Sequence, residues 1–147
     1  MPTTPLLPLP DDMDITSISK VPEGLLVRIV SERPSSPCPI CATVSSEVHS
    51  YYRRQPADLP CAGQPIRFCL SVRKFFCRVA DCPRKIFTER LPELIQPSSR
   101  LTTRLRTALQ QIGFESCGKA GERLAASLGL PLSDTTLLSS LLQAPHP

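Results

Sequence analysis

Two cysteine turns, Cys38-Pro-Ile-Cys41 and Cys77-Arg-Val-Ala-Asp-Cys82, decide the fold of this 147-residue chain. Each pair has the spacing of metal ligands, and the segment 42–76 between the pairs is basic and reads as β-strand. Tetrahedral zinc requires four sulfur donors about 3.5–4 Å from one another, and two tight turns that each present two thiolates supply that geometry. We therefore expect a small zinc ribbon in which structural Zn²⁺ is bound by Cys38, Cys41, Cys77 and Cys82.

Two other interpretations of these cysteines remain open, namely incidental thiol pairs and a redox Cys-x-x-Cys. A redox pair is expected to open a helix after a strand, whereas Pro37 and Pro39 surround the first pair and no helical pattern follows. His49 falls within a strand pattern and is expected on a strand surface. The remaining cysteines have no partner at ligand spacing and are expected to be small, partly buried hydrophobes: Cys61, Cys69 and Cys117.

The composition limits the size of the core and the class of protein. Aromatic residues make up 5% of the chain, no Trp is present, and 17 prolines argue against a single helical bundle. Seven cysteines without a signal peptide favour a reduced cytosolic protein, and no apolar run approaches the ~20 residues of a membrane span. Segment 31–97 has 10 basic and 6 acidic side chains, which favours a polyanionic partner, although a solvated surface gives the same balance.

The N-terminal two thirds of the chain reads as β structure. We expect residues 1–23 to be a mobile lead-in, or to include a short helix over about 11–18, and residues 58–63 to form a turn. Alternation over 65–77 predicts one buried face and one basic, partly exposed face. The buried face has Ile66, Phe68, Leu70, Val72 and Phe76, with Lys74 as the exception, and the other face has Arg67, Cys69, Ser71, Arg73 and Phe75. The expected strands are 24–31, 48–54, 65–77 and 86–88.

After Pro97 the apolar residues follow helical spacing. A first helix, capped by Ser98 or Ser99, is expected to end at Gly113, and a second is expected to end at Gly129. A third helix from Ser133 completes a helix-turn-helix pattern, although any small helical bundle gives the same trace. The predicted fold class is α+β, with a lead-in 1–23, a zinc-ribbon β domain 24–96, a three-helix helix-turn-helix domain 97–143 and a tail 144–147.

The sequence contains no recognisable catalytic set. It has two histidines and no Gly-rich phosphate loop after a strand, and its 13 carboxylates are scattered. A closed four-cysteine site also has no open coordination position, so we expect no enzyme activity. Basic side chains near the ribbon and on the first helix could instead neutralise DNA phosphates: Arg53, Arg54, Arg73, Lys74, Arg100 and Arg104.

Six short stretches, in order, resemble the zinc-finger region of bacterial insertion-sequence transposases of the ISL-three type. They are Cys38-Pro-Ile-Cys41, Val48-His-Ser-Tyr-Tyr-Arg-Arg54, Asp58-Leu-Pro60, Val72-Arg-Lys-Phe-Phe-Cys77, Asp81-Cys-Pro-Arg-Lys-Ile-Phe87 and Glu89-Arg-Leu-Pro92. Ala120-Gly-Glu-Arg-Leu-Ala125 and Ser133-Asp-Thr-Thr-Leu-Leu138 resemble the helix-turn-helix that follows in that family. The resemblance covers roughly residues 24–143.

The resemblance implies the same four zinc ligands, a bacterial cytoplasmic location and recognition of the terminal inverted repeats of a mobile element in double-stranded DNA. It also implies an RNase-H-like catalytic domain after the helices, and we expect this chain to be truncated before that domain. The chain departs from the family at Cys61, at Cys117-Gly118 and at Ser139-Ser140, where the third helix usually carries arginines. The base readers expected on that helix are Ser133, Thr135, Thr136, Ser139, Ser140 and Gln143.

The alternative function is a zinc-stabilised protein-interaction module. Such a module would pair with another copy of the chain or with an intact transposase, which it could inhibit, and its DNA contact would be incidental. The sequence also leaves open a small intact enzyme and a decayed gene product without a selected role.

Overall fold

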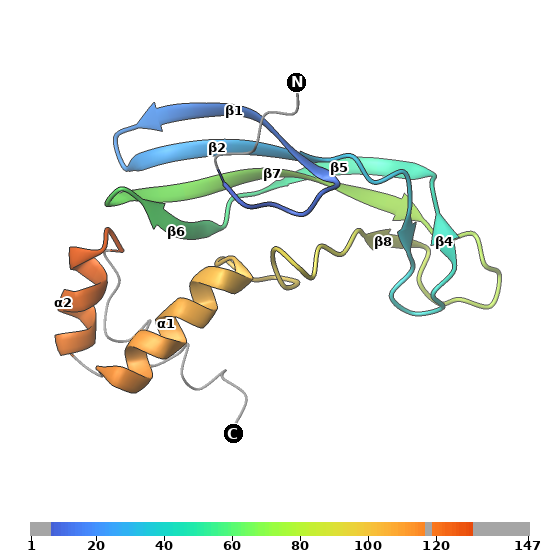
Figure 1. Cartoon of the computed structure of the whole chain (residues 1–147). Coiled ribbons are helices and arrows are strands. Elements are labelled where there is room, and N and C mark those ends of the chain that lie inside the picture. The colour runs from blue at the N-terminus through green and yellow to red at the C-terminus, as the bar shows by residue number, and fades with distance from the viewer. Residues whose placement is uncertain (1–6, 117–118, 131–147) are drawn as a thin grey trace.

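The computed structural model describes residues 7–116 and 119–130, and this part of the chain is mostly β structure with two helices. A long sheet forms one layer, and the segment after β8 and both helices lie on one side of it (Figure 1). The strands are β1 (Met13–Val21), β2 (Gly24–Ser31), β3 (Ser36–Pro37), β4 (Val44–Ser45), β5 (Val48–Arg54), β6 (Ala57–Cys61), β7 (Gln64–Phe76) and β8 (Ile86–Thr88). The helices are α1 (Thr103–Glu115) and α2 (Lys119–Ser127).

Strand β7 is the central strand of the sheet, because β2, β5, β6 and β8 all pair with it. The order across the sheet is β1-β2-β7-β5, with β6 and β8 also on β7. Strand β2 runs parallel to β7, whereas β5, β6 and β8 run antiparallel to it. Its predicted alternation holds for Ile66, Phe68, Leu70 and Val72, which are buried, but Cys69 and Phe75 of the other face are buried too, and Phe76 is only partly buried. The expected strands 24–31, 48–54, 65–77 and 86–88 are confirmed as β2, β5, β7 and β8.

Two local predictions were wrong. Residues 13–21 form strand β1, where a mobile lead-in or a short helix was expected, because this segment pairs with β2 along its whole length. The expected turn over 58–63 is largely strand β6, which adds to the edge of β7. In both cases antiparallel pairing with the next strand, across a two-residue turn, decides the structure, against the turn-forming residues in the local sequence.

The main core lies between the sheet and the chain that follows β8. The inner face of β2 and β7 contributes Val27, Ile29, Phe68 and Leu70. Segment 91–95 crosses this face and adds Leu91, Leu94 and Ile95, all of which are buried. The segment between β8 and α1 therefore acts as a cover over the sheet rather than as a linker between two domains.

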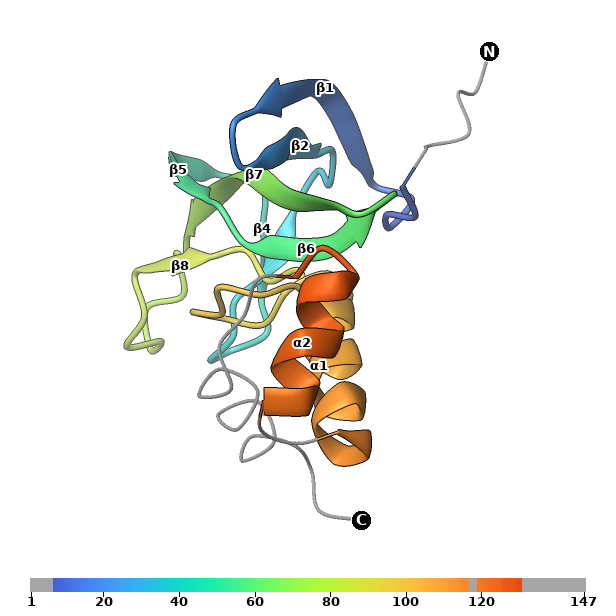
Figure 2. The same ribbon diagram turned by 90° about the vertical axis from the view of Figure 1, so that its left-hand side faces the viewer.

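The predicted three-helix helix-turn-helix domain was wrong. Two helices are described, and they do not form a bundle of their own, because Leu105, Leu109 and Ala125 pack in one cluster with Ala57 and Leu59 of β6. Figure 2 shows α1 and α2 side by side beneath the sheet. The helices are thus an extension of the sheet's inner side. The third helix expected from Ser133 lies outside the described residues.

The helix ends explain where the helical segments begin and stop. Thr102, rather than Ser98 or Ser99, caps α1, and its hydroxyl accepts a hydrogen bond from the N–H of Leu105 at 3.3 Å. Gly113 is buried inside α1 instead of ending it. Gly129 ends α2 as predicted, with φ of 93°, and the N–H of Leu130 then donates to the carbonyl of Ala125 at 2.8 Å. Within the described part of the chain, neither helix has the length and apolar character needed to cross a membrane.

Candidate metal centre

The first cysteine turn joins the short strands β3 and β4. The N–H of Cys38 donates to the carbonyl of Thr43 at 3.0 Å, and the N–H of Ala42 donates back to the carbonyl of Cys38 at 2.9 Å. Ala42 has φ of 61°, in the left-handed region, so the chain reverses sharply just after Cys41. These backbone bonds hold the two sulfurs of the turn on the same side.

The second cysteine turn continues directly from β7. The N–H of Cys77 donates to the carbonyl of Lys85 at 2.9 Å, and the N–H of Cys82 donates to the carbonyl of Val79 at 3.2 Å. Because Cys77 follows the last residue of β7, the register of the sheet fixes the position of its sulfur. The turn therefore connects the metal centre to the longest strand of the fold.

The four sulfurs converge as the spacing predicts. The Sγ atoms of Cys41 and Cys77 are 3.6 Å apart, and those of Cys38 and Cys82 are 3.9 Å apart. The four ligand atoms all lie within 4.8 Å of one another. Zn–S bonds of about 2.3 Å in a regular tetrahedron give sulfur separations of about 3.8 Å. The residues present therefore fit a closed, four-thiolate zinc ion.

An aromatic shell separates this centre from water. Phe75 and Phe87 are fully buried beside the cysteines and stack with ring centroids 5.8 Å apart. Phe75 was expected on the partly exposed face of β7. It is buried because strand β8 and the two cysteine turns close over it. Cys38, Cys77 and Cys82 are buried and Cys41 is partly exposed. This is the environment of a structural metal rather than of a site that admits substrate.

The protonation of the cysteines reflects their crowding. Hydrogen bonds from the hydroxyl and then the N–H of Thr43 lower the pKa of Cys41 to about 6. The N–H of Val79 lowers the pKa of Cys77, but burial and the three neighbouring cysteines outweigh it and raise that pKa to about 12. Four thiolates cannot share this volume unless a cation compensates their charge. A divalent, thiophilic ion meets that requirement.

The other potential ligands lie elsewhere. His49 is exposed on β5, where its ring meets the edge of Phe76 at 4.9 Å between centroids. Cys61 packs against the sheet core, and Cys69 is buried, with its Sγ 3.9 Å from an Nη1 of Arg28. Cys117 lies outside the described residues.

Residues 34–82 match the family described as the zinc-finger of transposase IS204/IS1001/IS1096/IS1165. Over this third of its length the chain is similar to that zinc finger. The match includes all four cysteines, and the family and the geometry together support structural Zn²⁺ as the cofactor. A search of curated proteins found no match. A search of solved structures also found none.

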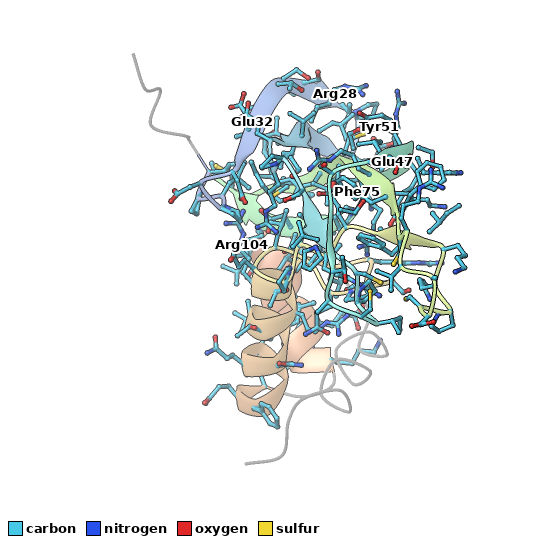
Figure 3. All side chains as sticks on the ribbon, turned by 90° about the vertical axis from the view of Figure 1, so that its right-hand side faces the viewer. Arg28, Glu32, Glu47, Tyr51, Phe75 and Arg104 are labelled. Atoms are coloured by element: carbon cyan, nitrogen blue, oxygen red, sulfur yellow. The ribbon has the colours of Figure 1, made fainter. Side chains whose placement is uncertain are left out.

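Two of the arginines predicted to contact DNA are bound to buried carboxylates. Arg73 pairs with Glu89, with Nη2 3.0 Å from Oε2, and its guanidinium lies 5.1 Å from the Phe75 ring centroid. Arg104 of α1 pairs with Asp58 of β6, and its Nε donates to Oδ1 at 2.8 Å. Figure 3 shows Arg104 at the start of α1, beneath the sheet. Both arginines connect elements of the fold.

The other basic residues predicted to contact DNA lie on different faces. Alternation along β5 places Arg53, which is exposed, and Arg54 on opposite sides of the sheet. Lys74 lies on the same side of the sheet as Arg54, with its Nζ 5.3 Å from the Tyr52 ring centroid. Arg100 is exposed in the segment before α1. The predicted base readers all lie outside the described residues: Ser133, Thr135, Thr136, Ser139, Ser140 and Gln143.

Sequence reasoning did not single out Arg84 and Arg90, which flank β8 and line a hollow on the side of Arg54. Neither residue lies in a periodic segment. The signals in the sequence were the basic excess of segment 31–97 and the position of both arginines in stretches that resemble the transposase zinc finger, and neither signal indicated a shared hollow.

Proposed function

We propose that this chain is the DNA-binding part of an insertion-sequence transposase and recognises the terminal inverted repeats of its element in the bacterial cytoplasm, without cutting DNA itself. The observation that carries the proposal is the match of residues 34–82 to a transposase zinc finger whose four cysteines converge on one point. Zinc would contribute to folding by joining the β3–β4 turn to the end of β7. The metal would thus set the positions of the basic side chains on β5 and β7.

The charge of the chain supports a nucleic-acid partner. The formal net charge is +4, and Arg53, Arg54, Lys74 and Arg100 have no ion pair among the described residues. Arginine and lysine that are not neutralised by carboxylates bind backbone phosphates and release counterions. In this proposal these four residues supply phosphate contacts, whereas Arg73 and Arg104 maintain the structure.

A mobility-shift assay tests this function. The probes are duplexes taken from the two ends of the DNA element that encodes the chain and scrambled duplexes of the same length and composition. We expect tighter binding to the element ends and a steep loss of affinity between about 50 and 200 mM salt. Absence of binding at low salt, or equal affinity for both probes, would contradict the proposal.

The second candidate function, pairing with a copy of the chain or with an intact transposase, is favoured by apolar side chains on the helices. Phe114 of α1 is 67% exposed and Leu124 of α2 is 41% exposed. Exposed apolar groups on neighbouring helices are typical of protein contact sites. Size-exclusion chromatography with light scattering distinguishes this candidate, because a dimer that binds no DNA would favour it over the first.

A further inference from the structure

A basic trough lies on the inner side of the sheet, beside β5 and β8. It consists of a hollow of about 490 Å³, lined in part by Arg54, Arg84 and Arg90, and an adjoining hollow of about 230 Å³ that includes Arg100. Arg54 and Ser98 line both hollows, so the hollows adjoin, and we call the pair the trough. It is bordered by the segment between β8 and α1, which runs beneath the sheet (Figure 1).

The net charge of the trough is positive because its one carboxylate is already neutralised. Glu89 lines the larger hollow, but its Oε1 accepts from the N–H and Nε of Arg73, at 3.0 and 3.2 Å, and its Oε2 accepts from Nη2 at 3.0 Å. Glu89 is also 3% exposed. Because Arg73 already neutralises this carboxylate, it should not repel an anionic ligand in the trough.

The arginines of the trough differ in how they are held. Arg54 is preorganised, because its Nη2 donates to the carbonyls of Gln96 and Ser99 at 3.2 and 2.6 Å. Within residues 7–116 and 119–130, the guanidinium groups of Arg84, Arg90 and Arg100 make no ion pair. One fixed cation is thus flanked by three that are available for a ligand.

We propose that this trough binds consecutive backbone phosphates of duplex DNA, with Arg84 and Arg90 on one side of Arg54 and Arg100 on the other. The inference rests on the proposed function and adds to it the face of the molecule that meets the DNA. Guanidinium groups match phosphate oxygens with paired hydrogen bonds, and their number here exceeds what a single small anion requires. Two adjoining hollows with several cations between them suit a charged strand.

The opposite face of the sheet carries basic side chains as well, but they are arranged differently. Arg28 and Arg67 are exposed there. The Nη1 of Arg28 donates to the Cys69 sulfur, and the Nη1 of Arg67 donates to the carbonyl of Gln55. Arg67 lines a different hollow of about 580 Å³, whose lining does not include Arg28 or Arg53. Figure 3 shows Arg28 and Tyr51 on this outer side, away from Arg104. Removing two arginines from either face therefore lowers the charge by the same amount, so variants of the two faces can be compared directly.

The test compares two double variants in the full chain. Arg84→Ala with Arg90→Ala removes two charges from the trough, and Arg28→Ala with Arg67→Ala removes two from the opposite face. Zinc content and circular dichroism confirm that each variant is folded. A third variant, Arg84→Lys with Arg90→Lys, restores charge without the planar donor pair.

We expect the trough variant to bind element-end duplex at least about tenfold more weakly and to lower the salt slope by about 2, because each lost phosphate contact removes about 0.9. The opposite-face variant should bind within about twofold of the parent chain, and the lysine variant should recover part of the affinity. If the parent chain binds and the trough variant binds equally well, the trough is not the interface, but the proposed function stands. If the parent chain binds no duplex, the proposed function fails and this inference fails with it.

Discussion

Asp58 of β6 and Arg104 of α1 form an ion pair that connects the sheet to the first helix across 46 positions of sequence. The Asp58 carboxylate is almost fully buried and accepts a third hydrogen bond from the Thr102 hydroxyl at 2.7 Å. Thr102 also caps α1, so one carboxylate orients the cap, the first turn of the helix and the edge of β6. The pair explains why the helices belong to the sheet rather than to a separate domain.

Replacing Asp58 with Asn should destabilise the fold. The change leaves the Arg104 guanidinium without its counter-ion beside a buried amide, and breaking such a pair reduces the free energy of unfolding by about 3 kcal/mol. Urea unfolding of the zinc-loaded protein measures the loss. Glu47→Gln is the matched control, because the Glu47–Arg78 pair is exposed and its removal should change stability little. Equal stabilities of the two variants would show that Asp58 is not a connection between sheet and helix.

Glu89→Gln should weaken the contact between β7 and β8 without releasing the metal. Glu89 holds the side chain and backbone N–H of Arg73, and the amide would keep at most part of that set. We expect a loss of about 2–4 kcal/mol in the free energy of unfolding, while zinc content stays at the parent level. Loss of zinc together with stability would mean that the Arg73–Glu89 pair also maintains the metal centre.

Gly129→Ala tests how closely α2 is docked against the sheet. Gly129 has φ of 93°, and an added Cβ would lie 2.6 Å from the carbonyl oxygen of Gly63 in the turn between β6 and β7. Backbone strain and this clash should together lower the free energy of unfolding by about 2 kcal/mol or more. Gly63→Ala is the control, since Gly63 has φ of 77° but its Cβ would meet nothing within 4 Å. A larger loss in the control than in Gly129→Ala would contradict the docking of α2.

Much of this architecture is visible in the sequence, because spacing and alternation are local signals. The two cysteine turns and the strands around β7 follow from them. The signal fails where contacts between elements decide the outcome. Asp58 belongs to a segment rich in turn formers, yet it lies in β6 because β7 pairs with this segment and Arg104 meets its carboxylate. Helical periodicity in Leu105 and Leu109 predicted helices correctly but did not show that they pack on Leu59.

Acidification should release zinc, and the hydrogen bonds from Thr43 should influence the pH at which the release occurs. Hydrogen bonds from Thr43 lower the pKa of Cys41 from 9.0 to about 6, so its thiolate is available above that pH and takes up a proton as the pH falls through it. Thr43→Val removes the hydroxyl donor, so the pH midpoint of zinc release should rise by up to about 1 unit. A metallochromic indicator follows the release across pH. Thr16→Val, which alters an exposed hydroxyl on β1, is the control. A midpoint unchanged in Thr43→Val would contradict this role.

The zinc content of the purified chain, measured beside that of Cys77→Ser, tests the central claim most directly. We predict about one zinc per parent chain, metal loss in Cys77→Ser with largely retained helical content, and full zinc content in the control Cys61→Ser, whose sulfur lies outside the metal centre. A Cys77→Ser protein that keeps its zinc, or a parent chain that binds none, would contradict the account.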